Sequence, residues 1–168
     1  MRAGVLAVVL LLGGAASAGA AEVGGAGWRL EAGPRFRPAG GVNGWTLLRD
    51  AEAPSEAEDY GLVMVRVQRA VAPEAGPRHL VGTLRSLRPF RFGVLPAPEV
   101  LRQAGLPVTL LEAPARRALT GAPLMLRAVL VHAPDRSFLL IASAPEAAWP
   151  GLREAVVAAL GSFRTARR

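Results

Sequence analysis

The sequence contains no cysteine and no lysine, and it has only two histidines. Without cysteine the chain cannot form disulfide bonds, thiolate metal sites, a cysteine nucleophile or the lipidated cysteine of a lipoprotein. All 20 basic residues are arginines, and alanine, glycine, proline, leucine and valine are abundant, as in proteins encoded by GC-rich DNA. Because this bias replaces lysine by arginine everywhere, the net charge of +7 does not by itself indicate a nucleic-acid or membrane partner.

Sequence motifs of the common catalytic sites are missing as well. There is no G-x-S-x-G or S-x-x-K nucleophile motif and no phosphate-binding G-x-x-x-x-G-K-[ST] loop. His79 and His132 have no carboxylate at a metal-ligand spacing, so we interpret both as packing residues and predict no catalytic residue, no metal and no cofactor. The alternative is an unrecognised enzyme in which one of these histidines meets a carboxylate.

The first 20 residues have the layout of a secretory signal peptide. Arg2 precedes an uncharged segment with the apolar centre Val5–Leu12, and both Ala16-Ser17-Ala18 and Ala18-Gly19-Ala20 fit the small-x-small cleavage rule. A retained membrane anchor is the alternative, but the strongly apolar part is much shorter than the roughly 20 residues that a span needs. We therefore expect cleavage after Ala20, export to the periplasm or the medium, and no stable membrane anchor afterwards.

The rest of the chain has the length of one domain, large enough to bury a core without disulfide bonds. Residues 21–44 are rich in glycine and proline and are expected to form a loose entry segment, followed by a single domain over residues 45–168. The acidic stretch Asp50–Asp59 has no apolar periodicity and is expected to be a solvated loop. A calcium loop is the alternative, although the stretch lacks the D-x-[DN]-x-[DN]-G order.

Apolar periodicity divides this domain into strands and helices. The clearest strand is Leu62–Val71, whose valines share one face while the other face carries Met64, Arg66 and Gln68. The expected strands are 45–49, 62–71, 108–113, 124–132 and 137–143, and the expected helices are 78–88, 98–105 and a last helix that begins at Pro150.

The last strand and the last helix are expected to form the main core. The turn Ala133–Arg136 predicts a hairpin between the last two strands, and Phe138–Ala142, apolar on both faces, predicts a central strand. The apolar stripe of the helix consists of Trp149, Leu152, Val156, Ala159 or Leu160, and Phe163. These elements together predict an α+β domain in which a mostly antiparallel β-sheet is covered by helices.

The order of these elements resembles the PsbP-like superfamily, whose members include small secreted bacterial proteins. The resemblance consists of an entry with Phe36, Pro38 and Trp45, and an ending with Leu140, Pro145-Glu146, Trp149 and Ser162-Phe163. It implies an α/β/α sandwich and a binding or assembly role without enzymatic activity. A weaker similarity is to the C-terminal accessory domain of some periplasmic zinc proteases, but the H-E-x-x-H motif is absent, so no peptidase activity is implied.

Four arginines form the only candidate binding site. They lie in and after the first helix and are Arg78, Arg85, Arg88 and Arg91. Our first hypothesis is a secreted, non-enzymatic domain that binds a protein partner in the bacterial cell envelope. The alternative is a module that binds an anion or a small molecule through this arginine-rich helix face, and the simplest interpretation is a solvated face without a ligand. Because we expect export, we predict no nucleic-acid partner.

Overall fold

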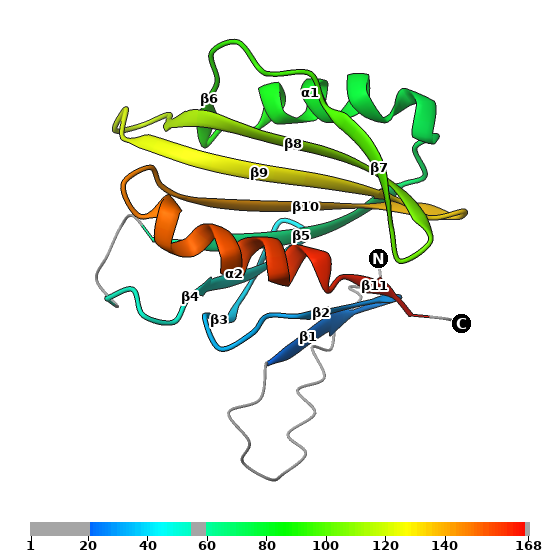
Figure 1. Ribbon diagram of the computed structural model, residues 1–168, viewed down its shortest axis with the longest axis horizontal. Coiled ribbons are helices and arrows are strands. Elements are labelled where there is room, and N and C mark those ends of the chain that lie inside the picture. The colour runs from blue at the N-terminus through cyan, green and yellow to red at the C-terminus, as the bar shows by residue number, and fades with distance from the viewer. Residues whose placement is uncertain (1–20, 55–59, 167–168) are drawn as a thin grey trace, which may run out of the picture.

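A large antiparallel β-sheet forms the centre of the structure (Figure 1). The computed structural model describes residues 21–54 and 60–166. In spatial order the strands of the large sheet are β3 (Phe36–Val42), β4 (Trp45–Asp50), β5 (Leu62–Arg69), β10 (Arg136–Pro145), β9 (Pro123–His132), β8 (Leu106–Arg117) and β6 (Phe90–Arg91). β7 (Glu99–Gln103) pairs with the first part of β8, beside this path. The predicted α+β class with a mostly antiparallel sheet is confirmed.

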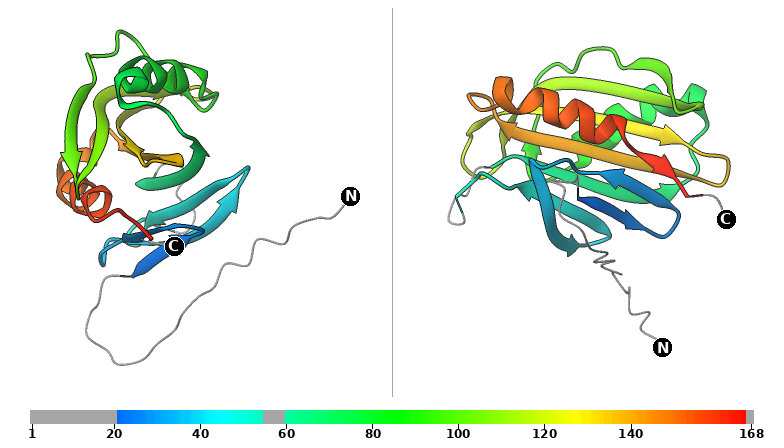
Figure 2. Two further views of the ribbon diagram at one scale, coloured as in Figure 1. Left: turned by 90° about the vertical axis from the view of Figure 1, so that its right-hand side faces the viewer. Right: turned by 60° about the horizontal axis from the view of Figure 1, so that its bottom comes forward.

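Two helices cover opposite faces of the large sheet, and Figure 2 shows them on either side of its curve. α1 (Gly76–Ser86) follows the short 3₁₀ helix η1 (Pro73–Ala75) and buries Leu80 and Leu84 against one face. α2 (Trp149–Gly161) packs on the other face. We call these two faces of the molecule the α1 side and the α2 side.

A small three-stranded sheet joins the two ends of the described chain (Figure 1). It consists of β1 (Glu22–Gly25), β2 (Trp28–Glu31) and β11 (Arg164–Thr165). The Ser162 hydroxyl at the end of α2 accepts a hydrogen bond from the Glu31 N–H at 2.8 Å. Phe163 lies between Trp28 and Phe138, with ring centroids 6.0 and 5.1 Å away. The small sheet therefore closes the core on the α2 side.

The end of the chain folds as its periodicity predicts. β10 lies between β5 and β9, which confirms a central last strand, and its pairing with β9 confirms the predicted hairpin. Pro150 lies in the first turn of α2. N–H groups of the first turn form no hydrogen bond within the helix, so the N–H that proline lacks is not needed there. The predicted stripe from Trp149 to Phe163 is buried, with no member more than 5% exposed.

The prediction of a loose segment over residues 21–44 is wrong, because this segment forms β1, β2 and β3. Short strands hide the periodicity, yet Trp28, Leu30 and Phe36 are all buried. Asn43 and Gly44 both have positive φ, 49° and 80°, as a type I′ hairpin turn requires. The Asn-Gly pair that joins β3 to β4 was therefore a turn signal, although the glycine-rich composition around it indicated disorder.

The prediction of a helix over Pro98–Gly105 is also wrong. Glu99–Gln103 forms β7, which pairs with residues Leu106–Leu110 of β8. Ala104 and Gly105 have φ values of 50° and 82°, so this hairpin too has a type I′ turn. The stretch has no apolar stripe that a helix could bury, and the available edge of β8 therefore determines its conformation.

The first residue of the expected solvated loop Asp50–Asp59 is buried, which the prediction did not include. Asp50 ends β4 and is only 4% exposed, and its carboxylate accepts a hydrogen bond from Arg35 at 3.0 Å. Arg35 also pairs with Glu52. Asp50 can be buried because the Arg35 guanidinium compensates its charge. Composition alone does not reveal this pairing. The other end of this stretch, residues 55–59, lies outside the described residues.

The predicted signal peptide, residues 1–20, lies outside the described residues, as do Arg167 and Arg168. Within residues 21–54 and 60–166, neither helix has the length and apolar character needed to cross a membrane.

Candidate functional site

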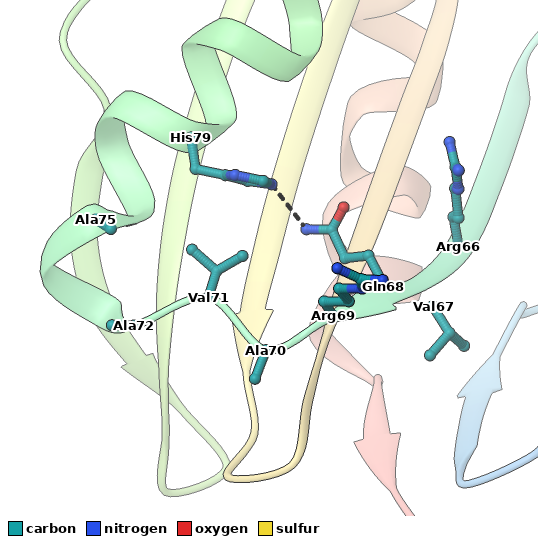
Figure 3. A pocket seen from close by; sticks show the side chains of 9 residues that line it. All are labelled: Arg66, Val67, Gln68, Arg69, Ala70, Val71, Ala72, Ala75 and His79. Carbon is teal, nitrogen blue, oxygen red and sulfur yellow. Dashed lines mark hydrogen bonds between the residues drawn. The ribbon is translucent and has the colours of Figure 1, made fainter.

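A cleft of about 860 Å³ lies where the end of β5 leads into α1 (Figure 3). We call it the β5 cleft. It is lined by Arg66, Val67, Gln68, Arg69, Ala70, Val71, Ala72, Ala75 and His79. The lining residues thus include two arginines, a glutamine and a histidine, and none of them is acidic. Its volume is in the range of ligand sites in proteins.

The alternation of β5 determines which of these side chains faces α1. Met64 belongs to the cluster under α1, so Arg66 and Gln68, at even positions, lie on the α1 side. Figure 3 shows Gln68 extending toward His79 in the first turn of α1, and their side-chain nitrogens are 3.2 Å apart. This contact joins the start of α1 to the strand, so both walls of the cleft are held in place.

The other histidine, His132, is a buried packing residue. Its Nδ1 donates to the carbonyl of Val71 at 2.8 Å, and its Nε2 therefore accepts the hydroxyl of Thr109 at 2.9 Å. The hydroxyl of Ser137 accepts the N–H of Val71 at 2.9 Å. These bonds fix the turn between β5 and α1, and both ring nitrogens of His132 have partners within the fold.

Gly76 begins α1 directly above His132. A Cβ atom at this position would lie 2.3 Å from the Thr109 hydroxyl and 2.8 Å from His132 Nε2. No side chain fits at that distance, so glycine allows the helix to approach the sheet closely.

The four predicted arginines do not form one cluster. Arg78 and Arg85 are exposed on the outer face of α1, two turns or about 10 Å apart, and Arg88 follows the helix. Arg91 lies in β6 opposite Arg116 of β8. Because its neighbour Phe90 packs on the α1 side, Arg91 points to the other side of the sheet. We keep the name α1 arginines for Arg78, Arg85 and Arg88.

Two arginines of the α2 side share one carboxylate partner. Glu112 accepts hydrogen bonds from Arg127 at 2.6 Å and from Arg153 of α2 at 3.0 Å. Partial burial raises the pKa of Glu112, but the two arginines outweigh this effect and the pKa lies below its ordinary value. By contrast, within the described part of the chain no ion pair involves an α1 arginine, Arg66 or Arg69.

Sequence reasoning missed the residues of the β5 cleft, although one signal was present. The polar residues Arg66 and Gln68 interrupt the second face of an otherwise apolar strand. In the structure Arg66 lies over the ring of Trp45, with its guanidinium carbon 5.7 Å from the ring centroid. That Arg69 and His79 line the same cleft follows only from the path of the chain.

A metal-dependent or histidine-dependent reaction finds no support in this geometry. In the ranges that the structure describes, no group of three or more histidine, aspartate or glutamate side chains could hold a metal ion. Gln68 is the side-chain partner of His79, and Thr109 that of His132, so neither histidine bonds to a carboxylate. The arrangement is suited to binding anionic groups through arginine.

Comparison with solved structures finds proteins of the same fold. PsbP of Synechocystis sp. PCC 6803 has a TM-score of 0.65 at 13% identity, and the match covers 92% of this chain and 96% of that one. LpqN of Mycobacterium tuberculosis, a protein involved in cell envelope biogenesis, has a TM-score of 0.64 at 13% identity, with 88% and 86% covered.

A protein of Bacteroides thetaiotaomicron VPI-5482 has a TM-score of 0.57 at 7% identity; the match covers 85% of this chain but 46% of that longer one. No family model matches the sequence, and neither does any curated protein. The chain thus has a PsbP-like fold, as its sequence resemblance predicts, and identities this low establish the fold alone.

Proposed function

We propose that this PsbP-like chain is an exported, non-enzymatic binding domain of the bacterial cell envelope that holds an acidic protein partner on its α1 side. The similarity to LpqN supports a role in the envelope, and the predicted signal peptide supports export. The alternative, binding of a small anion at the same arginines, is one outcome of the experiment below.

One observation carries the proposal: Arg66, which lines the β5 cleft, and the three exposed α1 arginines all lie on the α1 side, and among the described residues none of them forms an ion pair. Among the described residues, the α1 arginines and Arg66 have no carboxylate partner, whereas Glu112 pairs with two arginines on the α2 side. Unpaired guanidiniums around a cleft attract carboxylates, increase the rate of encounter and exclude basic partners.

The test is capture of the partner from envelope fractions of the native host with the tagged, signal-cleaved protein after chemical cross-linking. Charge reversal by Arg85→Glu with Arg88→Glu should abolish capture, because it turns an attractive surface into a repulsive one. Since Arg85 and Arg88 are exposed, the free energy of unfolding should change by less than about 0.5 kcal/mol.

The matched control is Arg29→Glu with Arg164→Glu. These two residues are exposed cross-strand neighbours in the small sheet and change the net charge by the same amount. Capture should survive in this control and should weaken as the salt concentration rises. Equal capture by both double variants would contradict the α1-side proposal. Binding of inorganic phosphate or acetate by the wild type, with no captured protein, would replace it by the small-anion alternative.

A further inference from the structure

The edge of β5 is only partly used by the sheet. β4 pairs with β5 from Arg49 opposite Leu62 to Trp45 opposite Arg66, and then turns away into β3. β5 continues to Arg69 and pairs on its other edge with β10 along its whole length. Beyond Arg66 the strand therefore presents an edge that no other strand of the described chain covers.

This free edge is the wall of the β5 cleft. Seven consecutive residues, 66 to 72, line the cleft, and in Figure 3 they run along it from β5 to the start of α1. A continuous run of this kind places main-chain groups as well as side chains at the cleft surface. Within the part that the structure describes, residues 67–70 make no backbone hydrogen bond outside the pairing with β10. Alternate N–H and C=O groups are thus available to another strand.

The charges of the edge lie on both faces of the strand. Arg66 lies on the α1 side, whereas Arg69 alternates to the opposite face. Arg69 stands opposite Arg136 in the pairing with β10, and Arg136 is held by Asp135 at 2.6 Å. Like charges in opposite positions are unfavourable, so the position opposite Arg69 in β10 gives it no favourable partner. A compact anion cannot reach both faces of a strand, but the alternating side chains of an extended peptide can.

We propose that the free edge that begins at Val67 in β5 and continues to Ala70 receives an extended acidic segment of the partner as an added β-strand. This inference rests on the proposed function and specifies how the partner is recognised. Main-chain hydrogen bonds to the edge supply affinity, and side chains opposite Val67, Gln68 and Arg69 supply specificity. The edge of four residues is about 14 Å long, enough for a short segment.

The register of the edge predicts the side chains that the segment carries. A residue opposite Val67, which is 40% exposed, lies on the same face as that side chain and should be apolar. A residue opposite Gln68 lies diagonally from Arg66, and a residue opposite Arg69 meets that guanidinium directly. Both should be acidic. The preferred segment therefore has two consecutive acidic residues beside an apolar one.

The first experiment titrates ¹⁵N-labelled, signal-cleaved protein with the acetylated, amidated heptapeptide TTEEVTT, and with its reverse sequence TTVEETT for the parallel direction. At least one should shift the amide resonances of Val67–Val71 and of His79 most strongly. The basic peptide TTKKVTT should not shift them. Absence of these shifts up to millimolar peptide, or shifts centred on Arg85–Arg91, would overturn the added-strand inference.

Backbone methylation of the bound peptide separates strand addition from simple ionic attraction. In an added strand, alternate N–H groups point toward β5 and the others point away. Methylating one alternate set should weaken binding at least tenfold, and methylating the other set should change it less than threefold. Equal tolerance of both methylated peptides would show that charge alone holds them and would refute the inference.

Charge reversal within the protein completes the test. Arg66→Glu with Arg69→Glu should weaken peptide binding at least tenfold. Arg85→Glu with Arg88→Glu should weaken it less than threefold, since Arg85 lies six residues or about 9 Å along α1 from His79 and the Debye length is about 8 Å. The inference fails and the proposed function stands if three results coincide. Envelope capture depends on Arg85 and Arg88, Arg66→Glu with Arg69→Glu leaves peptide binding unchanged, and both methylated peptides bind as tightly as the unmethylated one. Failure of capture itself would remove the proposed function.

Discussion

The two sides of the sheet have the same strands but are covered differently. On the α2 side, α2 and the small sheet cover the central strands, and aromatic rings from β2, β10 and the C-terminal end pack together. On the α1 side, one helix covers β8, β9 and β10, while Trp45 and Met64 on β4 and β5 stay half-buried. The difference teaches that the number of covering elements, more than the sequence of the strands, determines where side chains of the sheet stay exposed.

The largest expected effect compares one tryptophan from each side. Trp28 is 3% exposed and stacks on Phe163, whereas Trp45 is half-buried under the guanidinium of Arg66. Trp28→Ala should reduce the free energy of unfolding by about 3–5 kcal/mol because it leaves a cavity in a closed core. Trp45→Ala should cost about 1–2 kcal/mol because less apolar area is lost from burial. Urea denaturation of both variants measures the two losses, and similar values would contradict the comparison.

Two glycines of α1 test how closely this helix approaches the sheet. Gly76→Ala should destabilise the protein by about 1–3 kcal/mol, because the added methyl group meets Thr109 and His132. Gly82→Ala should stabilise it by about 0.5–1 kcal/mol, since a Cβ there meets nothing within 4 Å and alanine favours the helix. Thermal unfolding of both variants is the measurement. A stabilising Gly76→Ala would mean that α1 packs more loosely than described.

The smallest expected effect concerns pH and the ion pairs of the α2 side. The pKa of Glu112 lies below its ordinary value of 4.5 in the folded protein, so its charge adds stability above that pH, and this is lost as the pH falls through the lowered pKa. Solvent screening at the half-exposed Arg153 keeps the gain below about 1 kcal/mol.

The variant Glu112→Gln isolates this contribution. It should be less stable than the wild type at pH 7, and the difference should shrink below pH 4.5. Measuring the free energy of unfolding of both proteins at several pH values checks the sign. A difference that stays constant down to pH 2 would show that the ion pairs contribute nothing.

Long periodic segments were predictable from the sequence, and short ones were not. The stripe from Trp149 to Phe163 and the alternation of Leu62–Val71 repeat often enough to specify a helix and a strand. The five residues of β7 carry no such repeat, and their conformation depends on a free edge of β8 far along the chain. In residues 21–44, composition outweighed the turn signal Asn43-Gly44, which sequence reasoning had the means to use.

The candidate site was predictable only in part. The exposure of Arg78 and Arg85 on one helix face follows from their positions opposite Leu80 and Leu84. The β5 cleft depends on where β4 stops and on where α1 begins above His132, and neither is encoded in the local pattern. Arg91 was expected in a loop after the first helix, whereas it lies in β6, which pairs with β8.

The central claim is that the α1 side binds the partner and the α2 side does not. Hydrogen–deuterium exchange of the protein alone and in complex with its captured partner tests this claim most directly. The account predicts slower exchange in residues 66–88, which include the free edge of β5 and α1, and unchanged exchange in α2 and the small sheet. Protection confined to residues 149–165, with residues 66–88 unchanged, would contradict it.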